Sequence, residues 1–219
     1  MDTRSDELNH ISDWTQNNNL KLNLAKSQEI IFVDKQRKHN FAVPSKLKEI
    51  QRVDALKILG VTVTNGLSVS LHIQTVISSC AQSLYALRVL RAHGLQDSAL
   101  HNIYRSVVLA KLLYASSSWI GFSNATDRQK LQAFLNRSKR SGFCDSETED
   151  FATLCSTDDK QLFNRILNQP EHVLHPLLPS PSASQYNLRH RPHNRLLCQR
   201  ASRLTDCNFI IRMLYSDMY

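Results

Sequence analysis

The hydrophobic positions in the first third of the chain change period more than once. Leu8, Ile11 and Trp14 recur every third residue in a polar stretch, which predicts a short amphipathic helix that ends at a run of asparagines. Apolar and polar residues then alternate over residues 20–24, and residues 30–32 form a second apolar run. These two runs predict a pair of short strands.

A second hairpin is predicted over residues 50–63, which are rich in β-branched side chains. The stretch leads to Asn65-Gly66, a dipeptide that favours a tight turn. Gly60 lies inside the predicted hairpin, where a missing side chain indicates a bulge or the close approach of another backbone.

Beyond the hairpin, the apolar positions take a helical period. Residues 69–93 predict one long helix, and Gly94 is a suitable C-terminal stop for it. A second helix is expected to begin at a cap, Asp97 or Ser98, and to continue towards Trp119.

A third helix is expected to open with Thr126-Asp127-Arg128-Gln129, which fits a capping box, and to end near Gly142. Three consecutive amphipathic helices with short connections predict an antiparallel bundle. An acidic linker follows, then a short helix over residues 159–167 and a proline-rich stretch over residues 169–193 that suits no regular element. The tail beyond it is rich in arginine.

These patterns predict a mainly helical α+β chain in three parts. Residues 1–67 hold the first helix and the hairpins, and residues 68–142 form the helical bundle. Residues 143–219 hold the acidic linker, the short helix and a weakly ordered, basic tail.

Charge and composition add an expected partner. The 219 residues carry 27 Lys and Arg against 19 Asp and Glu, a formal net charge of +8, so an anionic partner is expected. The five cysteines are scattered without CxxC or paired Cys/His spacing, so no zinc site is predicted. With no run of about 18 apolar residues and no apolar leader, the chain is expected to be intracellular and free of membranes, with nucleus and cytoplasm both open.

Several short motifs follow one another along the chain. Residues 14–27 read W-T-Q-N-N-N-L-K-L-N-L-A-K-S, residues 41–65 contain L-K-I-L-G-V-T-V, and residues 67–73 fit L-S-x-x-x-H-I. The helices carry L-Y-A-L-R, Y-R-S-V and L-Y, and the tail reads P-E-H-V-L-H-P-L-L-P and then Y-N-L-R. Together these resemble the end of the palm, the "F-L-G-V" hairpin, the thumb and the C-terminus of reverse transcriptases from non-LTR (LINE-type) retrotransposons.

The resemblance implies a fragment of an RNA-directed DNA polymerase: a palm remnant, a thumb-like bundle and a C-terminal tail. In the family, an aromatic-x-Asp-Asp turn that binds catalytic Mg²⁺ lies just upstream of the first helix, where this sequence starts. We therefore expect no cofactor and no polymerisation by this chain, and at most weak, nonspecific binding of RNA or an RNA–DNA primer-template.

The candidate site residues each have a plainer alternative. Lys26 falls in the family's N-x-x-K-[ST] motif, which implies contact with the phosphates of an incoming nucleotide; the alternative is a solvated turn lysine. Lys57 belongs to the hairpin that resembles the primer-gripping element, or the hairpin only packs the palm onto the thumb. Basic residues of the bundle could follow nucleic-acid phosphates or form a solvated helix face, namely Arg88, Arg91, Arg105, Arg128, Lys130, Arg137, Lys139 and Arg140.

Other residues are assigned structural roles. The adjacent acids Asp158 and Asp159 are interpreted as a helix cap rather than a metal site. Trp14, Tyr104 and Trp119 are expected in the core rather than as base-stacking residues. Two further readings of the whole chain stay open: an inert transposon relic, and an adopted helical module that binds a protein through exposed palm-side surface.

Overall fold

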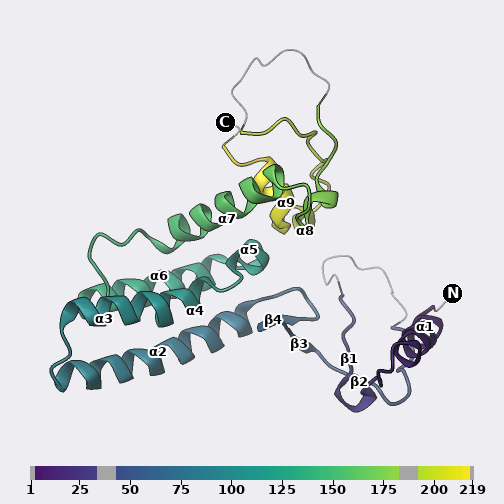
Figure 1. The fold of residues 1–219 in the computed structure, drawn as a ribbon, viewed down its shortest axis with the longest axis horizontal. Helices are drawn as coiled ribbons and strands as arrows, with labels where there is room; N and C mark the ends of the chain where they lie inside the picture. The colour runs from purple at the N-terminus through teal and green to yellow at the C-terminus, as the bar shows by residue number, and fades with distance from the viewer. Residues whose placement is uncertain (1–2, 34–42, 183–191, 218–219) are drawn as a thin grey trace. The chain divides into compact units, whose positions relative to one another are not determined.

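The computed structural model describes residues 3–33, 43–182 and 192–217. It is mainly helical with a small amount of strand, as the sequence predicts (Figure 1). The chain forms two compact units, Met1–Ser68 and Val69–Tyr219, so the bundle and the C-terminal part belong to one unit rather than to two. Phe41 and the Y-N-L-R motif lie outside the described residues.

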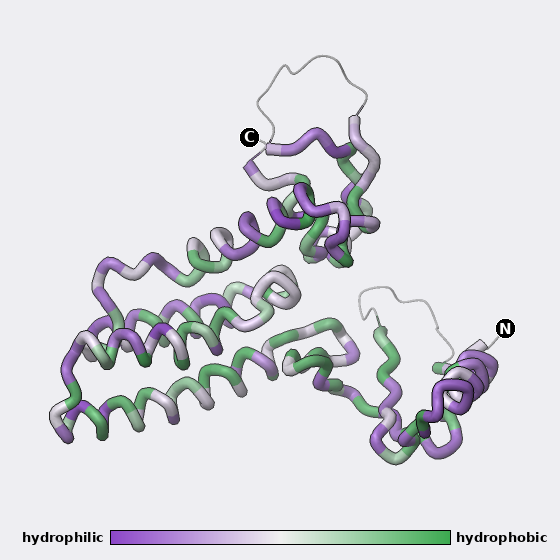
Figure 2. The backbone as a smooth tube through the Cα atoms, viewed as in Figure 1, coloured by the Kyte–Doolittle hydropathy of each residue, from purple (hydrophilic) through white to green (hydrophobic). Residues whose placement is uncertain are grey.

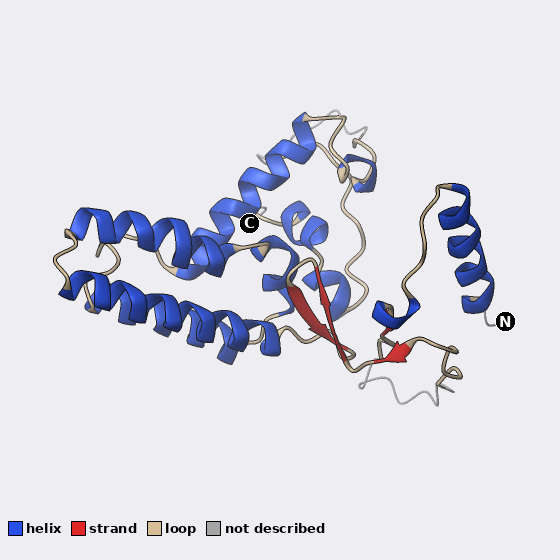
Figure 3. Ribbon diagram, turned by 60° about the horizontal axis from the view of Figure 1, so that its bottom comes forward, coloured by secondary structure: helices blue, strands red, loops and turns tan. Residues whose placement is uncertain are grey.

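The first unit joins an α-helix and a 3₁₀ turn to short strands (Figure 3). It consists of helix α1 (Arg4–Asn17), a 3₁₀ turn, η1 (Leu24–Lys26), and strands β1 (Gln28–Glu29), β2 (Gln51–Arg52), β3 (Ala55–Ile58) and β4 (Val61–Thr64). β1 pairs in parallel with β2, and β3 pairs antiparallel with β4. The short amphipathic helix predicted around Leu8, Ile11 and Trp14 is confirmed as α1.

The strand predicted over residues 20–24 is wrong. The side chain of Asn23 accepts a hydrogen bond from the Lys26 backbone N–H at 3.1 Å, which closes the η1 turn in place of an extended ladder. Asparagine competes with strand formation in this way because its short amide reaches its own backbone.

The second hairpin is confirmed, and so is the turn at Asn65-Gly66, where the Leu67 N–H donates to the Thr64 carbonyl at 2.8 Å. Ile58 pairs with Val61, so Leu59 and Gly60 are the two turn residues, with φ values of 46° and 92°. Positive φ at both central positions is the signature of a type I′ turn. Gly60 therefore serves the hairpin turn and not a bulge. Asn65 also donates to Asp54, from its backbone N–H to the carbonyl and from Nδ2 to Oδ1.

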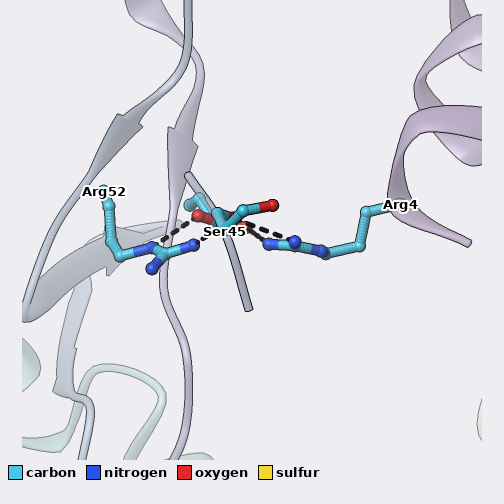
Figure 4. Close-up of polar contacts among 4 residues, drawn as sticks. Arg4, Ser45 and Arg52 are labelled. Atoms are coloured by element: carbon cyan, nitrogen blue, oxygen red, sulfur yellow. Dashed lines mark hydrogen bonds and ion pairs between the residues drawn. The ribbon is translucent and has the colours of Figure 1, made fainter. Parts of the chain in front are cut away.

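No described residue of the first unit is fully buried, and Figure 2 shows α1 as a largely hydrophilic helix. A polar cluster holds the unit instead (Figure 4). Arg4 and Arg52 both pair with the Glu29 carboxylate, and both donate to the Ser45 carbonyl, at 2.9 and 2.8 Å. The hydrogen bond from Arg52, opposed by desolvation and reinforced by Arg4, lowers the pKa of Glu29 from its ordinary value.

The second unit begins with a bundle of three helical segments, which lie side by side in Figure 1. These are α2 (Ser70–Ala92), a second segment made of α3 (Asp97–Ile103), η2 (Tyr104–Leu109) and α4 (Ala110–Leu113), and α6 (Ala125–Arg140). The second segment runs antiparallel to α2, because Lys111 contacts Ser79 while Val108 contacts Cys80. The α6 helix runs parallel to α2.

Local signals place α2 correctly. It begins and ends within one residue of the predicted bounds, and Gly94 follows it with a φ of 88° as the expected stop. The predicted second helix is instead interrupted: η2 is a π-helical stretch, and Ala115 takes a φ of 52° before α5 (Ser116–Trp119) and η3 (Ile120–Phe122).

Both predicted caps of the later bundle helices are also corrected. Neither Asp97 nor Ser98 caps α3, whose N-cap position is Gln96 without a side-chain cap bond. In α6 the cap is Asn124, whose side chain accepts from the Asp127 N–H at 2.8 Å, so the capping-box interpretation of Thr126 is wrong. Sequence patterns therefore predict the presence of a helix more reliably than they predict its first residue.

The C-terminal part packs on the bundle through α7 (Phe151–Asn168), which contacts α5 and α6. It is twice as long as the helix predicted there, because Asp150 caps it at the Thr153 N–H. After η4 (His175–Leu177) come α8 (Arg203–Cys207) and α9 (Phe209–Leu214). The basic tail is thus partly ordered: α9 lies against α7, and Met213 and Leu214 share a core cluster with Phe163.

Candidate nucleic-acid interface

A basic groove lies between the parallel helices α2 and α6. Ser70 at the start of α2 donates to Asp127 at the start of α6 at 2.6 Å, and Arg91 at the end of α2 donates to the Ser141 carbonyl just past α6 at 2.7 Å. The groove has a volume of about 470 Å³, and the residues lining it are Gln74, Ile77, Ser78, Lys130, Ala133, Arg137 and Arg140.

One wall of this groove is cationic because of the helical period of α6. Lys130, Arg137 and Arg140 are spaced by seven and three residues, which places them along one face, opposite the face that buries Leu131 and Leu135. None of the residues that line the groove is acidic. Like charges that share one face repel each other unless an anion or salt screens them, so the wall favours an anionic ligand.

An adjoining face of α2 carries a second, shallow groove. It has a volume of about 480 Å³, is lined by Leu71, Gln74, Thr75, Ser78, Ser79 and Gln82, and shares Gln74 and Ser78 with the basic groove. Lys111 of α4 donates from Nζ to the Ser79 hydroxyl at 3.0 Å. The solvent face of α2 therefore carries polar groups beside exposed apolar side chains such as Leu71, with cations on both flanks.

Three other basic residues that were candidates for phosphate contact make contacts within the protein. The Arg91 guanidinium lies 4.3 Å from the centre of the Phe143 ring in addition to its bond to Ser141. Arg128 donates from Nε to the Ser123 hydroxyl and from Nη2 to its carbonyl, both at 3.1 Å. Lys139 donates to the carbonyls of Ser146 and Thr148. These side chains fasten loops to helix ends.

The remaining predicted residues lie apart from the groove lining. Arg88 is exposed on α2, and Arg105 is exposed on η2 with a long, 4.0 Å pairing to Asp145. Lys26 and Lys57 belong to the first unit, where both are exposed. The sequence analysis missed Gln74, Ser78 and Lys111; the four-residue spacing of the polar positions on α2 was the available signal for the first two.

Asp159 is not a helix cap. It lies in the middle of α7, only 4% exposed, and its Oδ2 accepts from Arg212 of α9 at 2.8 Å. Arg212 also donates to the Ser117 carbonyl at 3.2 Å. An arginine predicted to lie in a solvated tail thus joins three helices. Within the described residues, no cluster of three or more His, Cys, Asp or Glu side chains is placed to hold a metal ion.

The core predictions for the aromatic residues are confirmed at two positions and wrong at one. Tyr104 and Trp119 are buried, as expected, and the Trp119 ring meets His72 edge-on with 5.5 Å between centroids. Trp14 is 59% exposed, so its prediction as a core residue is wrong. No residue of its helix, α1, is buried among the described residues.

No helix of the described residues combines the length and the apolar character needed to cross a membrane. Comparison with protein-family models, with curated proteins and with solved structures finds no match for this chain. The case for a function therefore rests on the basic groove and on the motifs of the sequence.

Proposed function

We propose that this chain is a fragment of an RNA-directed DNA polymerase of the LINE type that binds RNA or an RNA–DNA primer-template weakly and without sequence preference, through the α2–α6 groove. The observation that supports the proposal is the cationic wall formed by Lys130, Arg137 and Arg140 above an acid-free lining. Contacts of this kind read the phosphate backbone and not the bases.

The expected strength follows from the number of cations. Three phosphate contacts release about three counterions, so the logarithm of affinity should fall with the logarithm of salt concentration with a slope contribution of about −2 for a single strand and about −3 for a duplex. That is a small interface compared with those of sequence-specific proteins, which is why the proposed binding is weak.

Polymerisation is not part of the proposal. Two-metal phosphoryl transfer needs carboxylates that hold both ions close to the primer hydroxyl. The sequence contains no aromatic-x-Asp-Asp turn, and its Asp158-Asp159 pair offers no substitute because Asp159 is buried against Arg212. The described residues therefore do not fit a catalytic Mg²⁺ pair.

The test is a salt titration of binding to a labelled RNA and a labelled RNA–DNA primer-template, between about 50 and about 200 mM salt. The variant K130Q/R137Q/R140Q should reduce the slope by about 2 to 3 units. The matched control K46Q/K48Q/R165Q removes the same charge from exposed positions elsewhere and should keep most of the slope. Equal losses in both variants would show that net charge, and not the groove, binds the nucleic acid.

A polymerisation assay of the same preparation in Mg²⁺ or Mn²⁺ completes the test. We expect binding without primer extension. Incorporation of nucleotides that persists in the absence of contaminating polymerases would contradict the proposed loss of catalysis.

A second candidate function is supported by the first unit. Its described residues bury no side chain fully, whereas Trp14, Phe32 and Leu59 are at least half exposed. Exposed apolar surface of this kind marks a protein-binding site or an incomplete domain. If the chain is an adopted interaction module, W14S/L59N should abolish its association with a protein partner while leaving the salt-dependent binding of RNA unchanged.

A further inference from the structure

We propose that the ligand of the α2–α6 groove is an unpaired nucleic-acid strand, one base of which stacks on Tyr85. This inference rests on the function proposed above and specifies its ligand. The structure offers two parallel rows of groups, one cationic and one polar-aromatic, that together suit a single strand.

Tyr85 lies on the solvent face of α2, in line with Gln74 and Ser78, which both grooves share. At 3.6 residues per turn it is within about 20° of both Gln74 and Ser78 around the helix axis, and about 10 Å beyond Ser78 along it. Its side chain is 67% exposed. Within the described part of the chain, no hydrogen bond or ring contact engages it, so the face of the ring is free for a ligand.

The cationic row has the same direction and length. Lys130 and Arg140 are ten residues apart on α6, which is about 15 Å along the helix, and Gln74 and Tyr85 are about 16 Å apart on the parallel α2. Arg88, exposed and one turn past Tyr85, lies on the α6 side of the same face. A strand that runs along the groove would meet cations on one side and α2 on the other.

The groups on α2 favour unpaired bases. In a duplex the base faces are stacked inside and cannot reach a protein ring, whereas the bases of a single strand stack on exposed aromatic side chains. Gln74 and Ser78 add amide and hydroxyl groups that hydrogen-bond to base edges or sugars. A ligand held by its phosphates alone would contact the cationic row but not Gln74, Ser78 or Tyr85.

The test compares Tyr85→Leu with Tyr85→Phe in the full chain, using labelled oligouridine, its DNA counterpart and a duplex of the same length. Tyr85→Leu keeps an apolar side chain but removes the π-face, and should weaken binding of both single strands about 5- to 150-fold, which is the usual range for one stacked base. Tyr85→Phe should bind as the natural chain does. Binding of the duplex should change less than about twofold, and the salt slope should stay constant because no charge is removed.

Three outcomes would overturn the inference, and each differs from failure of the proposed function. If Tyr85→Leu bound single strands as tightly as the natural chain, the proposed stacking contact would be wrong. If the variant lost as much affinity for the duplex, the proposed preference for unpaired strands would be wrong. A change in self-association without a change in RNA binding, measured by light scattering, would make Tyr85 a protein contact. Failure of the proposed function would instead appear as a salt slope that K130Q/R137Q/R140Q does not alter.

Discussion

The buried ion pair between Asp159 and Arg212 should control the stability of the second unit. Replacing Arg212 by Met keeps much of the side-chain volume but leaves the Asp159 carboxylate, 4% exposed, without its cation. Removing one partner of a buried pair costs about 3–5 kcal/mol, because the other charge stays out of water. Since Arg212 itself is 24% exposed and water can replace part of it, we expect about 3 kcal/mol.

A loss of that size should lower the thermal midpoint by about 6–12 °C for a unit of this length. Urea unfolding followed by the fluorescence of Trp119, in a Trp14→Phe background, reports on the second unit because Trp119 is buried in it. The double variant D159L/R212M removes both charges and should recover part of the stability, since apolar replacements of buried pairs are often neutral or better.

The exposed pair Arg200–Asp206 supplies the control, because its side chains are 51% and 36% exposed and solvent replaces such contacts readily. Arg200→Met should leave the urea midpoint close to that of the natural chain. The reasoning would be refuted if R212M cost less than about 1 kcal/mol, or if the double variant were as unstable as the sum of the two single changes.

Three further changes test other contacts. Gly121→Ala would place a methyl group 2.1 Å from the Cys207 carbonyl oxygen, so we expect a loss of about 2 kcal/mol or more in urea unfolding, and a wild-type midpoint would refute the close approach. Asn124→Ala removes the α6 cap and should cost about 1 kcal/mol, whereas Asn124→Asp, which can still cap, should cost much less. Burial raises the pKa of Cys80 to about 11 and that of Cys155 to about 12, so stability should fall as the pH rises above 9 towards these values, and C80A/C155A should flatten that fall.

Much of the helical architecture follows from local sequence. The apolar period of α2 and the glycine after it are local signals, and the structure places both within one residue of expectation. The turn at Asn65-Gly66 was predictable and is present, but the hairpin turn was not, because the pairing of Ile58 with Val61 puts Leu59 at a positive φ. A leucine rarely takes that conformation, so only tertiary pairing reveals it.

The sequence predicted that basic side chains line the candidate site, but it did not predict which of them do. Lys130, Arg137 and Arg140 line the groove, as a basic helix face suggested, but Arg91 and Lys139 from the same prediction bind backbone carbonyls. Those carbonyls lie in loops whose course depends on the packing of α7 against the bundle. The same dependence explains Asp159, whose partner is 53 residues away in the sequence.

The polar cluster of the first unit should make this unit the part of the chain most sensitive to proteolysis. With no fully buried side chain among its described residues, this unit depends on one carboxylate, Glu29, that two arginines share. Local opening should therefore be frequent, and its amides should exchange with deuterium much faster than those of α2. A protease should cut within residues 3–68 first and leave a resistant piece that begins near Val69, so the lifetime of the intact chain would be set by its first third.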